Sequence, residues 1–272
     1  MKYEIIPPKG LVGLDFRELW RYRDLLYIFI WRDIKVRYKQ TAVGVAWAIF
    51  QPVLTMIIFS VLFGRLAKLP SDGAPYPIFV FTGLLLWNYF SASLINSSES
   101  LISNEAIVKK VYFPRILLPG STIITPAVDF AISFVVLLAL MLYYNFVPSA
   151  LGLLIVPVLL LIAMISSLGL GLFLSSLNVK YRDVRHIMPF FLQISMYVTP
   201  VIYPVTIIPQ KFQWIAYLNP MSGVITLARS LLLGSVQVEW ILLPISFGVA
   251  ILLLLFGLVY FRKTERFFAD IM

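Results

Sequence analysis

Four basic residues lie close together just before the first long apolar stretch of the chain: Arg32, Lys35, Arg37 and Lys39. Such a cluster can attract anionic lipid headgroups and orient the neighbouring span, and each base then contributes about 1 kcal/mol. It can also bind a ligand that carries phosphate, because the fork of an arginine guanidinium fits phosphate oxygens. The two interpretations are compatible, and the residues alone leave both open.

Asp129 is a second residue that suggests chemistry, because it is a lone acid inside a long apolar stretch. A carboxylate in lipid is costly, so such a residue marks a functional or paired position. The alternative is a hydrogen bond to a hydroxyl such as that of Thr125, one helical turn away. Because the expected spans hold no other acid, the sequence gives poor support to a proton relay of paired carboxylates.

The sequence lacks the residues that several other kinds of site require. The chain has no cysteine and one histidine, which excludes thiolate metal sites and makes a histidine-based metal site improbable. No glycine is followed directly by lysine, so the chain has no phosphate-binding loop of the ATPase type. We therefore expect that this chain binds no metal and no cofactor, and that it is not an enzyme.

The composition indicates a membrane protein. Hydrophobic residues make up 60% of the 272 residues and charged residues 13%, against about 25% charged in a soluble domain. The net charge of +9 is better explained by basic residues retained on the cytoplasmic side of a membrane than by a nucleic-acid partner. We predict an all-α integral membrane protein whose residues 1–272 form one transmembrane domain.

Six apolar stretches are long enough to span, since a span needs about 20 residues. They cover residues 44–64, 76–97, 116–144, 151–177, 187–203 and 240–261. The stretch 205–233 is apolar but interrupted by prolines and charges, so it is either a seventh span or a pair of short re-entrant helices on the outer face. Irregular backbone at membrane depth requires cover from protein or a cavity.

The distribution of lysine and arginine favours six spans. With the N-terminus inside, the cytoplasmic pieces 1–43, 98–115, 178–186 and 262–272 hold nine, three, three and three of these residues, 18 in all. The outer pieces hold the remaining four of the 22. This asymmetry predicts that both termini are cytoplasmic.

Residues 15–40 combine aromatic and charged residues at roughly helical spacing, with apolar members at Leu19, Tyr22, Leu26, Phe29 and Ile30. This pattern predicts an amphipathic interface helix with its rings in the acyl boundary and its bases toward the headgroups. The alternative is a soluble cytoplasmic helix that packs on a partner.

Aromatic residues make up 15% of the chain. Many are expected in the belts at the two membrane surfaces. Aromatic rings could also line a channel and stack on ring-shaped ligands, and for each single ring packing in the core or against lipid is the simpler role. The candidates for a channel are Phe50, Trp87, Tyr89 and Tyr197, together with Asp129.

The segment around the first span resembles the permeases of ABC-2 type polysaccharide exporters, the O-antigen, teichoic acid and capsule exporters. It reads RYKQT at 37–41, followed by Gly44, Trp47-Ala48 and Gln51-Pro52. Further matches are VYFPR at 111–115, YRDV at 181–184, PVIYP at 200–204 and NPM at 219–221. The matches extend over nearly the whole chain and are most similar to the O-antigen branch.

This resemblance implies a homodimer in a bacterial cytoplasmic (inner) membrane, with a separate ATPase subunit bound to each copy. ATP and Mg would bind to that partner. The substrate would be a glycan on a polyprenyl pyrophosphate lipid, surrounded by membrane lipids.

The resemblance also suggests a role for two cytoplasmic pieces, which are otherwise explained as solvated loops. They would transmit force from the ATPase, since mixed charges fix the register of a contact with a soluble partner. The residues concerned are Glu105, Lys109, Lys110, Lys180, Tyr181, Arg182, Asp183 and Arg185. His186 is interpreted as an interface or cap residue rather than a catalytic base.

Other functions have less support from these residues. A drug- or lipid-exporting permease of the same superfamily is disfavoured by the RYKQT and YFPR segments. A membrane glycosyltransferase that uses polyprenyl phosphate would need an acidic pair for a metal, which the sequence lacks. A channel or a scaffold has the least support.

Overall fold

The computed structural model describes residues 16–39, 42–234 and 238–268. Within them the chain is helical and has no strand. Gln40 and Thr41 of the RYKQT segment lie outside the described residues.

Among the described residues, five stretches are long and apolar enough to cross a membrane. The first joins helix α3 (Ala42–Phe59) to the π-helical segment η1 (Ser60–Leu66). The second is α4 (Tyr76–Ser103) and the third combines α6 (Leu117–Thr122) with α7 (Thr125–Tyr143). The last two are α8 (Ala150–Lys180) and α12 (Leu242–Glu265). The prediction of an all-α membrane protein with several spans is thus confirmed.

Two of the predicted spans take a different form. The stretch 116–144 is broken between α6 and α7, where Pro126 stands in the first turn of α7 and cannot donate a backbone hydrogen bond to the preceding turn. The stretch 187–203 becomes α9 (Val184–Val198), whose 15 residues rise only about 22 Å. It ends at Val198 because Pro200 and Pro204 follow closely.

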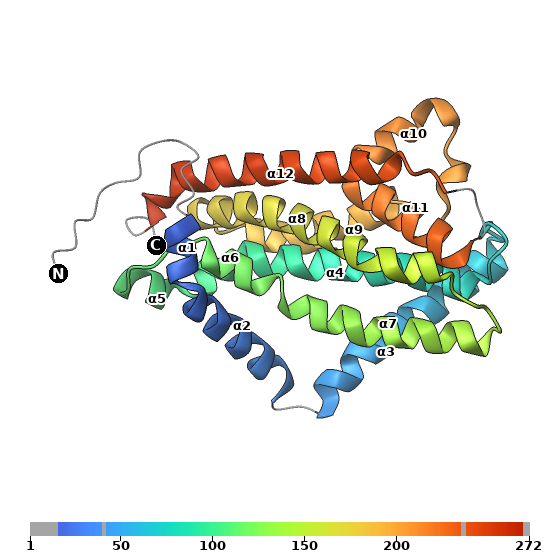
Figure 1. The fold of residues 1–272 in the computed structure, drawn as a ribbon, viewed down its shortest axis with the longest axis horizontal. Helices are drawn as coiled ribbons and strands as arrows, with labels where there is room; N and C mark the ends of the chain where they lie inside the picture. Colours follow the sequence, from blue (N-terminus) through green and yellow to red (C-terminus); the bar gives the residue numbers. More distant parts are fainter. Residues whose placement is uncertain (1–15, 40–41, 235–237, 269–272) are drawn as a thin grey trace.

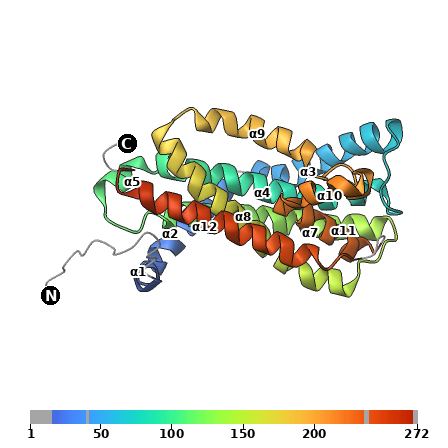
Figure 2. The same cartoon turned by 90° about the horizontal axis from the view of Figure 1, so that it is seen from above.

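The remaining helices are short and gather at the two ends of the bundle. Helices α1 (Phe16–Arg21) and α5 (Glu105–Lys110) lie at one end, beside the last turns of α12 (Figure 1). At the other end lie the 3-10 turn η2 (Val205–Ile207), α10 (Gln210–Tyr217) and α11 (Pro220–Leu233). The turn from α8 into α9 is at the same end as α5 (Figure 2).

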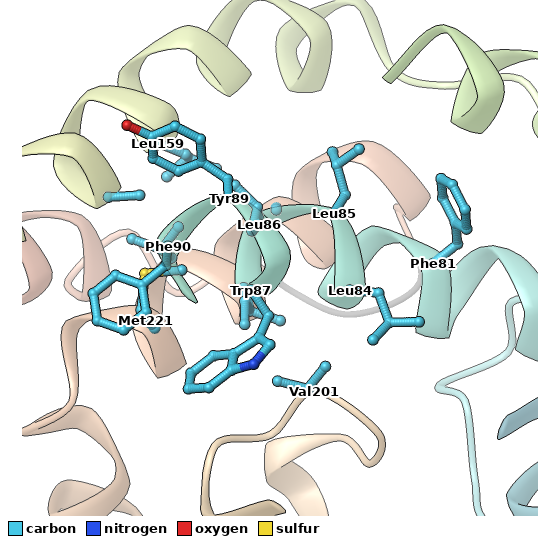
Figure 3. Close-up of a cluster of buried hydrophobic side chains, with 14 of the residues drawn as sticks. Phe81, Leu84, Leu85, Leu86, Trp87, Tyr89, Phe90, Leu159, Val201 and Met221 are labelled. Atoms are coloured by element: carbon cyan, nitrogen blue, oxygen red, sulfur yellow. The ribbon is translucent and has the colours of Figure 1, made fainter. Parts of the chain in front are cut away.

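Helix α4 is the centre of the bundle. In its most apolar stretch of 18 residues 78% of the residues are buried, against 11% in the first span. Its large side chains form the main core with residues of α8, α11 and the turn after α9, such as Leu159, Met221 and Val201 (Figure 3). Helices α8 and α12 approach closely where Gly169 faces Gly257, since a Cβ on Gly257 would lie 2.0 Å from the Gly169 carbonyl oxygen. The first span, in contrast, is peripheral, because so little of it is buried.

Helix α2 (Arg23–Tyr38) and α3 form a V that leans away from this core (Figure 1). The predicted apolar stripe of α1 and α2 packs on protein. Phe29 is 4% exposed and its ring centroid lies 5.7 Å from that of Phe113. Leu19, Tyr22 and Leu26 pack against the same cluster.

A second core at the α6 end of the bundle thus covers this stripe, so these side chains contact protein and not lipid. The location of the helix at the membrane interface stays a prediction. The aromatic rings that α1 and α2 leave exposed are Trp20, Tyr27 and Trp31.

Candidate functional site

Two neighbouring cavities lie between the V and the central helix α4. The first, of about 510 Å³, is bounded by α3, α4 and α7 and is here called the inner mixed cavity. The second, of about 450 Å³, is bounded by α2, α4 and the α6–α7 segment and is called the inner polar cavity. Arg37 lines both cavities and therefore stands on their common wall.

Arg37 is held in place by Asp129, which also lines the inner mixed cavity. The Arg37 Nη2 atom lies 2.5 Å from Asp129 Oδ2, and the Tyr38 hydroxyl donates to Asp129 Oδ1. Burial and the carboxylate of Asp129 raise the pKa of the Tyr38 phenol, so Tyr38 stays a neutral donor. Asp129 is thus a paired acid that joins α7 to the end of α2.

Asp129 does not bond to the alternative partner, the hydroxyl of Thr125. Thr125 Oγ1 is buried and makes no hydrogen bond in the described structure. The sequence could have suggested Arg37 as the partner, because a lone acid in an apolar stretch requires a base and Arg37 is among the nearest to the spans. The role of Tyr38 has no comparable signal in the sequence.

Arg32 also has an acid beside it. Its Nη2 lies 2.8 Å from Asp33 Oδ1, and its Nη1 donates to Asn104 Oδ1 over 2.8 Å. Arg32 lines the inner polar cavity with Asp33 and Asn104. Lys35 and Lys39, in contrast, are exposed and make no ion pair among the described residues. The four bases therefore separate into two arginines that pair with acids and two lysines without an ion pair among the described residues.

The inner mixed cavity combines rings with polar groups. Trp47, Tyr89 and Phe130 line it, together with the polar residues Gln51 and Asn88, which are not among the predicted channel residues. Tyr89 donates to the Ile123 carbonyl oxygen over 3.2 Å, at the break between α6 and α7. Such a surface suits a ligand that is partly apolar and partly hydrogen-bonding.

The structure separates the other channel candidates from the two cavities. Trp87 is 3% exposed and packs in the core beside Phe90 (Figure 3). Phe50 is exposed on α3, with its ring centroid 5.9 Å from that of Trp47. Tyr197 is exposed on α9.

The two pieces that the sequence predicts to be cytoplasmic lie near each other at the α5 end of the bundle. The Lys109 ammonium lies 2.5 Å from the Glu105 carboxylate. Lys109 and then the cation of Arg182 lower the pKa of Glu105, so the loop after α8 acts electrostatically on α5.

The remaining residues of this group are mostly exposed. The Lys180 ammonium lies 5.1 Å from the ring centroid of exposed Tyr181, and Arg185 Nε donates to His186 Nε2. Asp183 and Lys110 are exposed.

Residues 24–233 match the model of the ABC-2 type transporter family. The chain belongs to this family. The family is one of transporter permeases, and its place in an ABC transporter implies an ATPase partner. The prediction of a permease rather than an enzyme is confirmed.

Similar proteins point to one branch of the family. An O-antigen export system permease protein RfbA of Klebsiella pneumoniae is 32% identical over 250 residues, which cover 92% of this chain and 95% of that protein. The RfbA of Myxococcus xanthus is 32% identical over 77% of this chain and 80% of its own length. A polysialic acid transport protein KpsM of Escherichia coli is 24% identical, covering 86% and 91%.

Proposed function

We propose that this chain is the permease subunit of an ABC exporter that moves a lipid-linked, O-antigen-like polysaccharide across the cytoplasmic membrane of a bacterium. The similarity to O-antigen export permeases over 92% of the chain carries this proposal. The cavities support it, because a glycan on polyprenyl pyrophosphate combines an apolar tail, a charged headgroup and hydroxyl groups.

The proposed topology has six crossings with both termini in the cytoplasm. Helix α9 would be the fifth crossing, and α10 and α11 would dip into the outer face and return. Nearly every side chain of α11 is buried by protein, which meets the requirement for a short helix at membrane depth. Residues 1–272 would then form one domain.

Cysteine labelling tests this topology cleanly because the chain has no cysteine of its own. Lys211, Asp183 and Lys263 are exposed positions in α10, in the loop after α8 and in the last turn of α12. A membrane-impermeant maleimide added to whole cells should label Lys211→Cys and leave Asp183→Cys and Lys263→Cys unlabelled. External labelling at 263 would contradict six crossings.

The proposed assembly is a homodimer with two ATPase subunits, which would bind the ATP and Mg. The first span leaves most of its apolar surface uncovered, and such a surface needs lipid or a second copy against it. The residues at 105–110 and 180–185 would contact the ATPase, since they are charged, mostly exposed and close together.

The basic cluster would bind the pyrophosphate of the lipid carrier. Lys35 and Lys39 are exposed for a first encounter, and Arg37 stands at the cavity wall. The Asp129 carboxylate already pairs with Nη2 of Arg37. A pyrophosphate would therefore have to share this arginine with Asp129 or displace the carboxylate.

Gene deletion tests the function itself. Cells without this chain should accumulate polyprenyl-linked glycan in the cytoplasmic leaflet and lose that glycan from the outer surface, and the wild-type gene should restore both. A matched strain in which the partner ATPase cannot hydrolyse ATP should show the same accumulation. Normal surface glycan in the deletion strain would refute the proposal, and loss of drug efflux alone would favour a drug exporter.

A further inference from the structure

The inner polar cavity is unusually hydrophilic for a site beside membrane spans. Of its 11 lining residues, Val36 is the single apolar one. The polar ones come from α2, α4 and the α6–α7 segment, so three separate elements contribute to one cavity. Those used in the argument below are Arg37, Asp33, Asn96, Glu99 and Thr125.

Two lining residues hold polar atoms without a partner. Thr125 is 4% exposed, and its Oγ1 makes no hydrogen bond. Asp33 uses Oδ1 for Arg32, whereas its buried Oδ2 has no partner in the described structure. Buried polar groups in folded proteins are nearly always satisfied, so these atoms are available to a ligand with hydroxyl groups or to water.

The charges of this cavity do not suit a bare phosphate. Its two cations, Arg32 and Arg37, are matched by two acids, Asp33 and Glu99. Arg32 is already paired with Asp33, and Arg37 with Asp129. A phosphate inside would face carboxylates, whereas a neutral polyhydroxyl ligand would donate to them.

The volume of about 450 Å³ also falls in the range of small-molecule sites. Carboxylates accept hydrogen bonds from sugar hydroxyls, and amides such as that of Asn96 can both donate and accept. Arg37 on the cavity wall is placed to contact a phosphate that lies just outside. The arrangement thus offers adjacent positions for a sugar and for a phosphate.

We propose that the inner polar cavity binds the sugar attached directly to the pyrophosphate of the lipid carrier. Asp33 and Glu99 accept hydrogen bonds from its hydroxyls, and Thr125 and Asn96 supply further polar contacts. This inference rests on the proposed function and deepens it, because it gives the exporter a means to distinguish a loaded carrier from an empty one.

The test measures binding to the purified permease–ATPase complex in nanodiscs. The probes are a polyprenyl pyrophosphate without sugar and the same lipid carrying one glucose, galactose, mannose or N-acetylglucosamine. The variants are Thr125→Val, which removes a hydroxyl that has no partner, and Glu99→Gln, which keeps the side-chain shape. Thr55→Val in α3 is the matched control, since its hydroxyl donates only to the Gln51 carbonyl and lines neither cavity.

For the wild type, at least one sugar-bearing probe should bind more tightly than the sugar-free lipid. Each cavity variant should reduce this preference roughly fivefold, as expected for one lost hydrogen bond, with binding of the sugar-free lipid unchanged. The control should keep the full preference. Circular dichroism and melting of each variant verify that it is folded.

Three outcomes would overturn the inference while the proposed function stands. The wild type binds all probes equally, or the variants weaken both lipid classes alike, or phosphatidylglycerol competes as well as the sugar-bearing lipid and so identifies a general headgroup site. Failure of the wild type to bind any polyprenyl pyrophosphate would instead contradict the proposed function.

Discussion

Arg229 and Arg37 are both arginines next to apolar helices, yet they are held in contrasting ways. Arg229 of α11 is 6% exposed and donates to backbone carbonyl oxygens of Phe79, Pro200, Val201 and Tyr203. The side chain of Arg37 is 42% exposed and pairs with one carboxylate, that of Asp129.

The difference lies in what each arginine can exchange. The partners of Arg229 are main-chain atoms of α4 and of the turn after α9, fixed by the fold, and its guanidinium carbon lies 3.6 Å from the ring centroid of Phe79. An incoming anion would have to break several hydrogen bonds at once. Arg37 pairs with one carboxylate and borders two cavities.

We therefore infer that Arg229 fixes the outer elements to the core, whereas Arg37 can exchange Asp129 for a ligand. The substitutions below test this contrast, beginning with the largest expected loss of stability.

Arg229→Met should be the most damaging change. It removes every charge-assisted hydrogen bond to the four carbonyls and leaves buried acceptors unsatisfied, which costs at least about 4 kcal/mol. The folded yield and the melting temperature in detergent should fall sharply. Lys211→Met, at an exposed site in α10, is the control and should melt like the wild type. Equal melting of the two variants would mean that Arg229 does not fix these elements.

Gly83→Ala tests the space that the Arg229 arrangement needs. A Cβ at this position would lie 2.5 Å from the Arg229 Nη2 atom and 2.9 Å from the Val201 carbonyl oxygen. We expect a loss of about 1–3 kcal/mol, measured by thermal or chemical denaturation. Gly248→Ala in α12 has open space around its Cβ and should be neutral or slightly stabilising. A neutral Gly83→Ala would contradict the tight packing.

Arg37→Lys should leave the fold nearly unchanged and weaken ligand binding. It keeps the charge that orients the span but loses the bidentate fork that suits both Asp129 and a pyrophosphate. We expect insertion at wild-type level and about a tenfold weaker affinity for polyprenyl pyrophosphate, with loss of its stimulation of ATP hydrolysis. If Arg37→Lys and Arg37→Gln both kept full stimulation and export, the cluster would act only as an orientation signal.

Asp129→Asn should change affinity in the opposite direction. The Arg37–Asp129 pair is partly exposed, so its loss should cost no more than about 1 kcal/mol of stability. Arg37 would then meet a pyrophosphate without a competing carboxylate, and binding should tighten a few-fold. Glu265→Gln, which breaks the Arg262–Glu265 pair and lines neither cavity, should leave the affinity unchanged. Weaker binding by Asp129→Asn would show that Asp129 positions Arg37 rather than competes for it.

Much of this arrangement could be predicted from the sequence, because lipid imposes simple rules on length and charge. The long spans follow from apolar runs, and the basic residues at 98–115 and 178–186 predict that these two segments lie at the same end of the bundle, as they do. Which side chains pack in the core and which remain exposed could not be predicted. Trp87 and Phe50 are both aromatic residues in apolar stretches, yet one is buried in the core and the other is exposed.

Arg229 is one of the four lysines and arginines that the sequence places in the outer pieces, and a single sequence gives no sign of the backbone carbonyls that surround it. The apolar stripe of α2 was assigned to lipid for a similar reason. Periodicity shows that Leu26 and Phe29 share a face, but whether lipid or a second core covers that face depends on α6 and Phe113, which are distant in sequence.

Asp183→Arg should have the smallest effect on the fold and a clear effect on coupling. Asp183 occupies the N-cap position of α9, but its exposed side chain makes no capping hydrogen bond. The favourable interaction of its charge with the helix terminus is worth about 0.3–1 kcal/mol, so reversal should lower the melting temperature only slightly.

A contact with the ATPase, in contrast, depends on the sign of the charge. The variant should insert normally, co-purify with less ATPase and export less glycan. Asp183→Asn is the matched control, because it removes the charge without reversing it. Its co-purification with the ATPase and its export should lie between those of the wild type and of Asp183→Arg. Full co-purification and export by Asp183→Arg would show that this loop is a solvated surface, and the contact would then have to be sought around α5.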